Sequence, residues 1–215
     1  MLRTLARAAV LVVAAGAGAV FAADRALVVY CSHDADACEL AARTFERDTG
    51  IATAITRKPT GEFYAQLRAE RANPKADVWY GGTIDPFLQA AAENLFVEYR
   101  SPQLAALAPW ARDVTRASGY RVAAIYRIVI GFGTNPELLA RRGVAAPRCW
   151  SDLPAAAYRN EIELSNPVTS GTGYTILATL VTLYGEDAAF AYLKGLRPNV
   201  IRYTQSGTAQ GPSVA

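Results

Sequence analysis

Three times between residues 26 and 95 the chain passes from an apolar run through a short polar loop into a helix-like segment. The apolar runs lie at 26–32, 51–58 and 76–83, and β-branched residues occur in each of them. Strands that alternate with helices need crossover connections, and these place parallel strands in one sheet with helices on both faces. The sequence therefore predicts an α/β fold built on a mainly parallel sheet.

Polar loops follow all three predicted strands, at residues 31–34, 60–62 and 81–83. In open parallel sheets, ligands bind just outside the carboxyl ends of the strands. We therefore expect these three loops to converge on one side of a binding site.

The pattern changes near residue 120. Residues 120–135 are rich in β-branched and aromatic side chains, and they predict a long strand that leaves one sheet and enters another. A short helix over 136–143, a helix within 149–158 and a strand over 161–167 follow. We predict a first lobe over residues 24–118 and a second α/β lobe over 119–215.

The segment 165–180, SNPVTSGTGYTILATL, runs from a small, hydroxyl-rich loop into an apolar helix. Ser170 is the expected cap, and Gly171 and Gly173 allow close backbone approach. The first N–H groups of a helix have no intrahelical partner, so an anion at this end is stabilised without any charged side chain. On this segment alone, a capped helix that binds nothing is an equal alternative.

The residues needed for common catalytic reactions do not occur in the required patterns. Tyr174 stands where a phosphate-binding loop of the Walker type needs a lysine, and Ser170 lacks the glycines of a nucleophile elbow. The only histidine, His33, lies in a different loop. Pairs such as Asp34 and Asp36 are typical of solvated surfaces. We predict that the protein is not an enzyme.

Residues 1–22 have the three parts of a secretory signal peptide, with cleavage expected near Ala22/Ala23, so we predict a periplasmic protein. An uncleaved N-terminal anchor is the alternative. Loss of Arg3 and Arg7 lowers the formal net charge from +3 to +1. A nearly neutral chain gives no indication of nucleic-acid binding.

The three cysteines fit an oxidising compartment. Cys31 and Cys38 are seven positions apart, and we expect a short disulfide between a strand end and the next helix. A metal site made by both cysteines and His33 is the weaker alternative, because a closed zinc site needs four ligands. Cys149 is then expected to be a small buried apolar side chain.

The chain resembles the periplasmic solute-binding proteins of ABC transporters, specifically the type II group that includes ferric-ion, phosphosugar and phosphonate receptors. The resemblance is carried, in order, by LVVYCS, FERDTGI, RKPTGE, AERANPKADVWYGG, GFGTNPELL, CWSDL, NPVTSGTGYTILATL and YGEDAAFAYLKGL. It implies two α/β lobes joined by β-strand hinges, a monomer that closes over its solute, and delivery to a membrane permease driven by an ATPase.

The resemblance also implies the ligand-binding residues. On the first lobe they are Ser32, His33, Thr60, Gly61, Gly82 and Thr83, and on the second they are Ser170, Gly171, Thr172 and Gly173. Glycines replace the glutamate that ferric receptors carry after the third strand. We therefore expect a phosphate ester, a phosphonate or a carboxylate. Ferric iron with a synergistic anion is the second choice, with His33 as its candidate ligand, and no other cofactor is expected.

In that family the chain crosses back to complete the first lobe, and no such return lies within residues 1–215. We therefore expect a C-terminally truncated product that is poorly stable. A periplasmic sensing module for a signalling partner is the alternative function, and a secreted enzyme is a weaker one.

Overall fold

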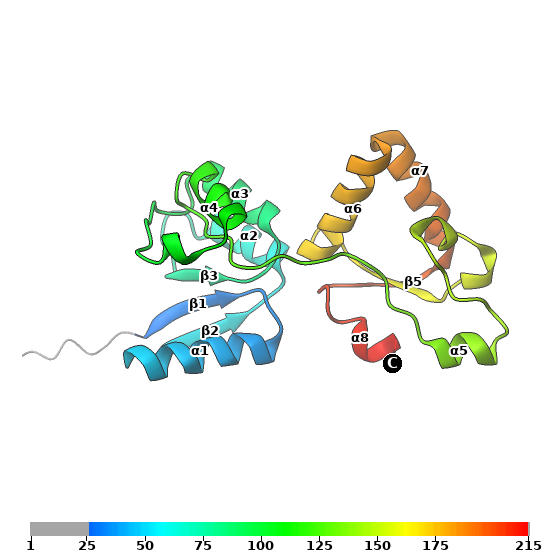
Figure 1. Cartoon of the computed structure of the whole chain (residues 1–215), viewed down its shortest axis with the longest axis horizontal. Helices are drawn as coiled ribbons and strands as arrows, with labels where there is room; N and C mark the ends of the chain where they lie inside the picture. The colour runs from blue at the N-terminus through cyan, green and yellow to red at the C-terminus, as the bar shows by residue number, and fades with distance from the viewer. Residues whose placement is uncertain (1–25, 215) are drawn as a thin grey trace, which may run out of the picture.

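The computed structural model describes residues 26–214, which form two α/β lobes joined by a long extended segment (Figure 1). The expected signal peptide and its cleavage point lie outside the described residues. Between residues 26 and 214, no helix is long and apolar enough to cross a membrane. All elements of the first lobe end by residue 117, and those of the second begin at residue 136. The predicted boundary at 118/119 stays a prediction.

The first lobe contains a three-stranded parallel sheet in the order β2-β1-β3. Leu27 of the central strand lies opposite Thr53, and Val29 lies opposite Val78. The predicted parallel α/β sheet is therefore confirmed in this lobe. The strands are β1 (Leu27–Cys31), β2 (Thr53–Arg57) and β3 (Val78–Tyr80).

Helices cover both faces of this sheet, with α1 on one face and α2, α3 and α4 toward the other (Figure 1). Aromatic rings fill the interior: Tyr30 stacks on Phe63 with centroids 4.5 Å apart, and Trp79 stacks on Phe87 at 3.8 Å. The helices are α1 (Ala35–Thr49), α2 (Thr60–Ala69), α3 (Ile84–Ala92) and α4 (Pro109–Ala117), with a 3-10 turn at Leu104–Ala106.

The second lobe has a two-stranded parallel sheet made by β4 (Ile162–Ser165) and β5 (Val200–Thr204). Buried Leu180 and Leu196 are the apolar centre of its helices. Asn199 links the end of α7 to the 3-10 turns, because its side-chain amide donates to the backbone carbonyl oxygens of Leu153 and Ala155 at 2.7 Å. The helices are α5 (Pro136–Arg141), α6 (Gly171–Tyr184), α7 (Glu186–Leu196) and α8 (Gly211–Val214), with a 3-10 turn at Arg197–Asn199.

The long strand predicted over residues 120–135 is wrong. Residues 122–135 form no strand, and this connecting segment runs unpaired from one lobe to the other (Figure 1). β-Branched side chains favour extended backbone, but a strand also needs a hydrogen-bonded neighbour, and no strand between residues 26 and 214 pairs with this segment. Val129 is consequently 96% exposed.

The helix predicted within 149–158 is replaced by two 3-10 turns, Trp150–Asp152 and Ala156–Tyr158. Pro154 lies between them and is incompatible with a helix interior. Cys149 caps the first turn and is exposed, so the prediction that its side chain is buried is wrong. Its position at a turn on the surface places it outside the packed core.

Candidate ligand-binding cleft

A cleft of about 210 Å³ lies between the lobes, at the carboxyl ends of β1, β2 and β3 and at the N-terminus of α6. The structure brings eight of the ten predicted ligand-binding residues to its walls. They are Ser32, His33, Thr60, Gly82, Thr83, Ser170, Gly171 and Thr172.

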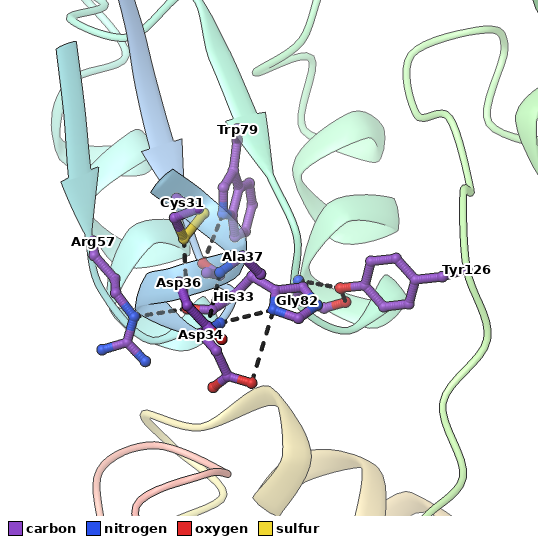
Figure 2. The surroundings of a disulfide bond; sticks show 11 residues. Cys31, His33, Asp34, Asp36, Ala37, Arg57, Trp79, Gly82 and Tyr126 are labelled. Carbon is purple, nitrogen blue, oxygen red and sulfur yellow. Dashed lines mark hydrogen bonds and ion pairs between the residues drawn. A yellow bond between two sulfur atoms is a disulfide. The ribbon is translucent and has the colours of Figure 1, made fainter. Parts of the chain in front are cut away.

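Residues 32–34 follow β1 and form one edge of the cleft (Figure 2). Trp79 Nε1 donates to Ser32 Oγ at 2.9 Å. His33 Nδ1 accepts a hydrogen bond from the Asp34 backbone N–H at 2.8 Å. A neutral imidazole that accepts at Nδ1 carries its proton on Nε2, so His33 has a donor available at Nε2.

A disulfide links Cys31, the last residue of β1, to Cys38 in α1, with Cα atoms 6.1 Å apart (Figure 2). It closes the short loop that carries Ser32 and His33. Because both sulfur atoms are bonded to each other, neither is available as a thiolate ligand, and the alternative metal site of Cys31, His33 and Cys38 is excluded. Within residues 26–214, no three His, Cys, Asp or Glu side chains gather as a metal site.

The opposite edge of the cleft is the N-terminus of α6. Ser170 Oγ accepts from the Gly173 N–H at 3.2 Å, as a helix cap does, and Ser170 is 2% exposed. The helix dipole and the first N–H groups are therefore directed at the cleft from a fixed position.

The hydroxyl of Thr83 meets this helix end from the first lobe. Thr83 is buried, and its Oγ1 has no hydrogen-bond partner in the described part of the chain. A Cβ placed on Gly171 would lie 2.2 Å from Thr83 Oγ1 and 2.9 Å from Thr60 Oγ1. Two hydroxyl groups therefore converge on the start of α6, and the oxygen of Thr83 is buried there without a partner.

Gly61 and Gly173, the other two predicted ligand residues, do not line the cleft. The Gly61 N–H donates to Thr169 O across the lobes at 2.9 Å, and a Cβ there would lie 2.3 Å from Val168 O. A Cβ on Gly173 would lie 2.6 Å from Ser165 O. Both glycines permit close backbone packing beside the cleft.

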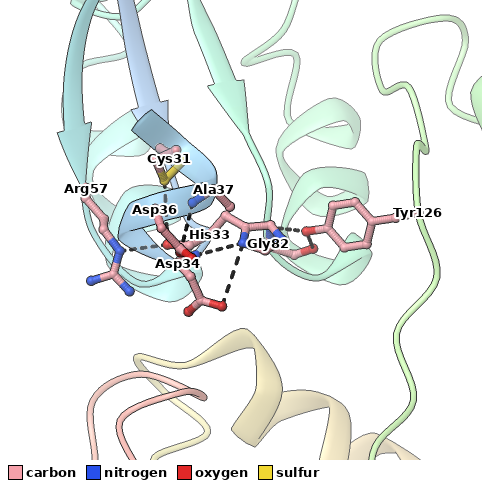
Figure 3. Close-up of polar contacts among 9 residues, drawn as sticks. Cys31, His33, Asp34, Asp36, Ala37, Arg57, Gly82 and Tyr126 are labelled. Atoms are coloured by element: carbon pink, nitrogen blue, oxygen red, sulfur yellow. Dashed lines mark hydrogen bonds and ion pairs between the residues drawn. A yellow bond between two sulfur atoms is a disulfide. The ribbon is translucent and has the colours of Figure 1, made fainter. Parts of the chain in front are cut away.

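Gly82 lines the cleft, but its backbone N–H is already used. Tyr126, from the connecting segment, accepts a hydrogen bond from Gly82 N at 2.7 Å and donates one to Gly82 O at 2.9 Å (Figure 3). Burial raises the pKa of the Tyr126 hydroxyl above its usual value, so it stays protonated at neutral pH.

Sequence reasoning missed the charged residues of the cleft. Arg57 and Lys58 line it at the end of β2, and Asp34 lines it in the neighbouring loop after β1. Arg57 Nε donates to His33 O at 2.7 Å, and Lys58 Nζ donates to Gln66 Oε1 at 2.8 Å. The position at the carboxyl end of a parallel strand was the signal for both cations. Also missed were Pro59, Tyr126, Ile128, Ser206, Gly207 and Thr208.

A family profile described as bacterial extracellular solute-binding protein matches residues 73–212. An uncharacterised protein of Haemophilus influenzae is 41% identical over 182 residues, which are 84% of this chain and 53% of that protein. A Salmonella typhimurium protein, provisionally described as a 2-aminoethylphosphonate-binding periplasmic protein, is 30% identical over 91% of this chain and 56% of its own length.

Among solved structures, the periplasmic binding protein AfuA of Actinobacillus pleuropneumoniae, with exogenous fructose 6-phosphate bound, matches with a TM-score of 0.85 and 41% identity. The match covers 88% of this chain and 60% of that one. The present chain thus spans about half the length of the curated relatives it matches. Its two lobes have the type II periplasmic-binding-protein fold predicted from the sequence.

Proposed function

The chain belongs to the bacterial extracellular solute-binding proteins, and we propose that it captures a small phosphorylated or phosphonate solute between its lobes. The solute is then delivered in the periplasm to the membrane permease of an ABC uptake system. The role is capture and not catalysis, in keeping with a family named for solute binding.

The observation that carries this proposal is the unpartnered, buried Oγ1 of Thr83 facing the N-terminus of α6. A buried hydroxyl without a partner is unfavourable by about 1–3 kcal/mol, and a solute oxygen would supply the missing hydrogen bond. The same oxygen would lie against the free N–H groups of the helix, which favour an anion.

The charged residues of the cleft support an anion with more than one negative charge. Arg57 and Lys58 supply two positive charges at the end of β2, and Asp34 supplies one negative charge. Arg57 is held to His33 O through Nε, so its terminal nitrogens are not used by that bond. A phosphate ester or a phosphonate carries charge close to −2 and accepts several hydrogen bonds, which suits this set better than a single carboxylate.

The size of the cleft supports a small solute. At about 210 Å³ it is smaller than the roughly 300–1,000 Å³ of pockets that hold drug-sized ligands. The compounds named for two relatives belong to this chemical class. One relative was solved with fructose 6-phosphate bound, and the other is described as binding 2-aminoethylphosphonate.

A thermal-shift screen tests the proposal with fructose 6-phosphate, 2-aminoethylphosphonate, dicarboxylates and ferric salts as separate additions. A ligand at 100 times its dissociation constant stabilises the folded state by about 2.7 kcal/mol. We expect a saturable rise in melting temperature with at least one of the two phosphorus compounds. A shift with only the dicarboxylates or only the ferric salts would overturn the assignment of the solute.

A pair of variants on one helix tests whether the cleft is responsible. Thr172→Leu adds bulk at the cleft wall, whereas Thr182→Leu makes the same change on the exposed part of α6. We expect the ligand-dependent shift to disappear in the first variant and to persist in the second. A shift that persists in both variants would place the solute elsewhere.

A further inference from the structure

Tyr126 connects the segment between the lobes to the loop that follows β3. Its single hydroxyl accepts from the N–H of Gly82 and donates to the carbonyl oxygen of the same residue (Figure 3). Both polar backbone groups of Gly82 are therefore satisfied by one side chain that is 44 positions away in the sequence.

The backbone conformation of Gly82 is tightly restricted by its surroundings. Its φ is +105°, a conformation open to glycine, and a Cβ there would lie 2.6 Å from Thr60 Oγ1 and 3.1 Å from Ser32 Cβ. The next residue is Thr83, whose unpartnered hydroxyl faces the start of α6. The orientation of the Gly82 backbone therefore determines where the Thr83 hydroxyl lies.

The ring of Tyr126 also packs edge-on against His33, with centroids 5.5 Å apart and an interplanar angle of 74°. Two neighbouring contacts hold the connecting segment. Arg127 lies over the Trp110 ring of the first lobe at 4.5 Å, and Phe132 packs edge-on against Trp150 of the second lobe at 5.5 Å. Tyr126 is thus a side chain of this segment that lines the cleft and is hydrogen-bonded to its wall.

We propose that Tyr126 is a positioning residue for solute binding: through its two hydrogen bonds it fixes Gly82, and thereby holds the Thr83 hydroxyl against the N-terminus of α6. Tyr126 acts through Thr83 and does not itself need to contact the solute. The effect on affinity rests on the function proposed above, whereas the effect on Gly82 does not.

The binding test uses Tyr126→Phe, which keeps the ring against His33 and removes both hydrogen bonds. Calorimetric titration with fructose 6-phosphate should give an affinity about tenfold weaker than wild type, as expected for the loss of a buried hydrogen-bond pair. In a Thr83→Ala background the same change should alter affinity by less than about twofold, because the residue it positions is gone. Equal losses in both backgrounds, or wild-type affinity in Tyr126→Phe, would overturn the proposal.

Amide exchange at Gly82, followed by NMR, provides a readout that needs no solute. Tyr126→Phe should speed exchange of the Gly82 N–H by about tenfold or more. Tyr192→Phe is the matched control, because Tyr192 donates a comparable hydrogen bond to Trp150 O at 2.6 Å, outside the cleft. That control should leave both Gly82 exchange and affinity unchanged.

The two readouts separate the two proposals. If fructose 6-phosphate and 2-aminoethylphosphonate both fail to bind the wild-type protein, the proposed function is wrong, and Gly82 exchange alone decides the role of Tyr126. Unchanged exchange in Tyr126→Phe would overturn the positioning role whatever the titrations show.

Discussion

Replacing Gly171 by alanine should weaken solute binding far more than it weakens folding. Gly171 opens α6 at the place where the two lobes meet. A Cβ there would lie 2.2 Å from Thr83 Oγ1, 2.9 Å from Thr60 Oγ1 and 3.2 Å from Thr60 Cβ. Both threonines are buried, so neither can move away freely. The new methyl group is therefore accommodated only if the lobes separate or the two hydroxyl groups shift.

The size of the effect follows from where the overlap occurs. Overpacking of this kind typically costs about 1–3 kcal/mol. The atoms that collide belong to different lobes, so the cost falls on the closed arrangement and not on either lobe alone. At about 1.4 kcal/mol per factor of ten, the dissociation constant for fructose 6-phosphate should rise roughly 5- to 150-fold.

Calorimetric titration measures this change, and small-angle X-ray scattering reports whether the lobes separate. Gly195→Ala is the matched control, because a Cβ on that glycine of α7 would meet no atom within 4 Å. The control should bind as wild type does, and its melting temperature should be unchanged or slightly higher. Wild-type affinity in Gly171→Ala would show that the lobes do not close on this glycine.

Two further predictions concern stability. Reducing the disulfide between Cys31 and Cys38, which are seven positions apart, should lower the free energy of unfolding by about 2 kcal/mol, as measured by denaturant titration with and without dithiothreitol; coincident curves would contradict this. Hydrogen bonds from Arg202 and Ser213 hold the pKa of Glu163 below its usual 4.5. The stabilisation is therefore complete above about pH 4.5 and is lost as the pH falls through the lowered pKa. The melting temperature of Glu163→Gln should fall less than that of wild type between pH 5 and 3, and parallel decreases would contradict the assignment.

Much of the first lobe follows from local sequence patterns. Apolar runs and polar loops placed β1, β2 and β3 correctly, because successive parallel strands of one sheet must be joined by crossover connections, here helices. The connecting segment 122–135 was wrongly predicted to be a strand because strand formation also depends on residues that are distant in the sequence. Its composition favours extended backbone, but strand pairing depends on which other strands pack beside it. A local sequence pattern does not predict those neighbours.

The same distinction applies to the cleft. Ser32 and Thr83 follow parallel strands, so the topology of the first sheet predicts that they lie together, whereas the position of Ser170 across from them was implied by the family resemblance. Arg57 and Lys58 lie at the end of β2, so the same rule identifies them as cleft residues, although neither is a hydroxyl or glycine residue. Tyr126 had no sequence signal, because its bond to Gly82 joins distant positions within an irregular segment.

A paired calorimetric titration of the wild-type protein with fructose 6-phosphate and with fructose, at equal concentrations and ionic strength, tests whether the cleft binds an anion. The sugars are identical apart from the phosphate, so the difference between the two isotherms reports the contribution of the anion. We expect saturable binding of the phosphate ester, no measurable binding of fructose, and weaker binding of the ester in Arg57→Gln. Equal affinity for the two sugars would contradict an anion site at Thr83 and the N-terminus of α6.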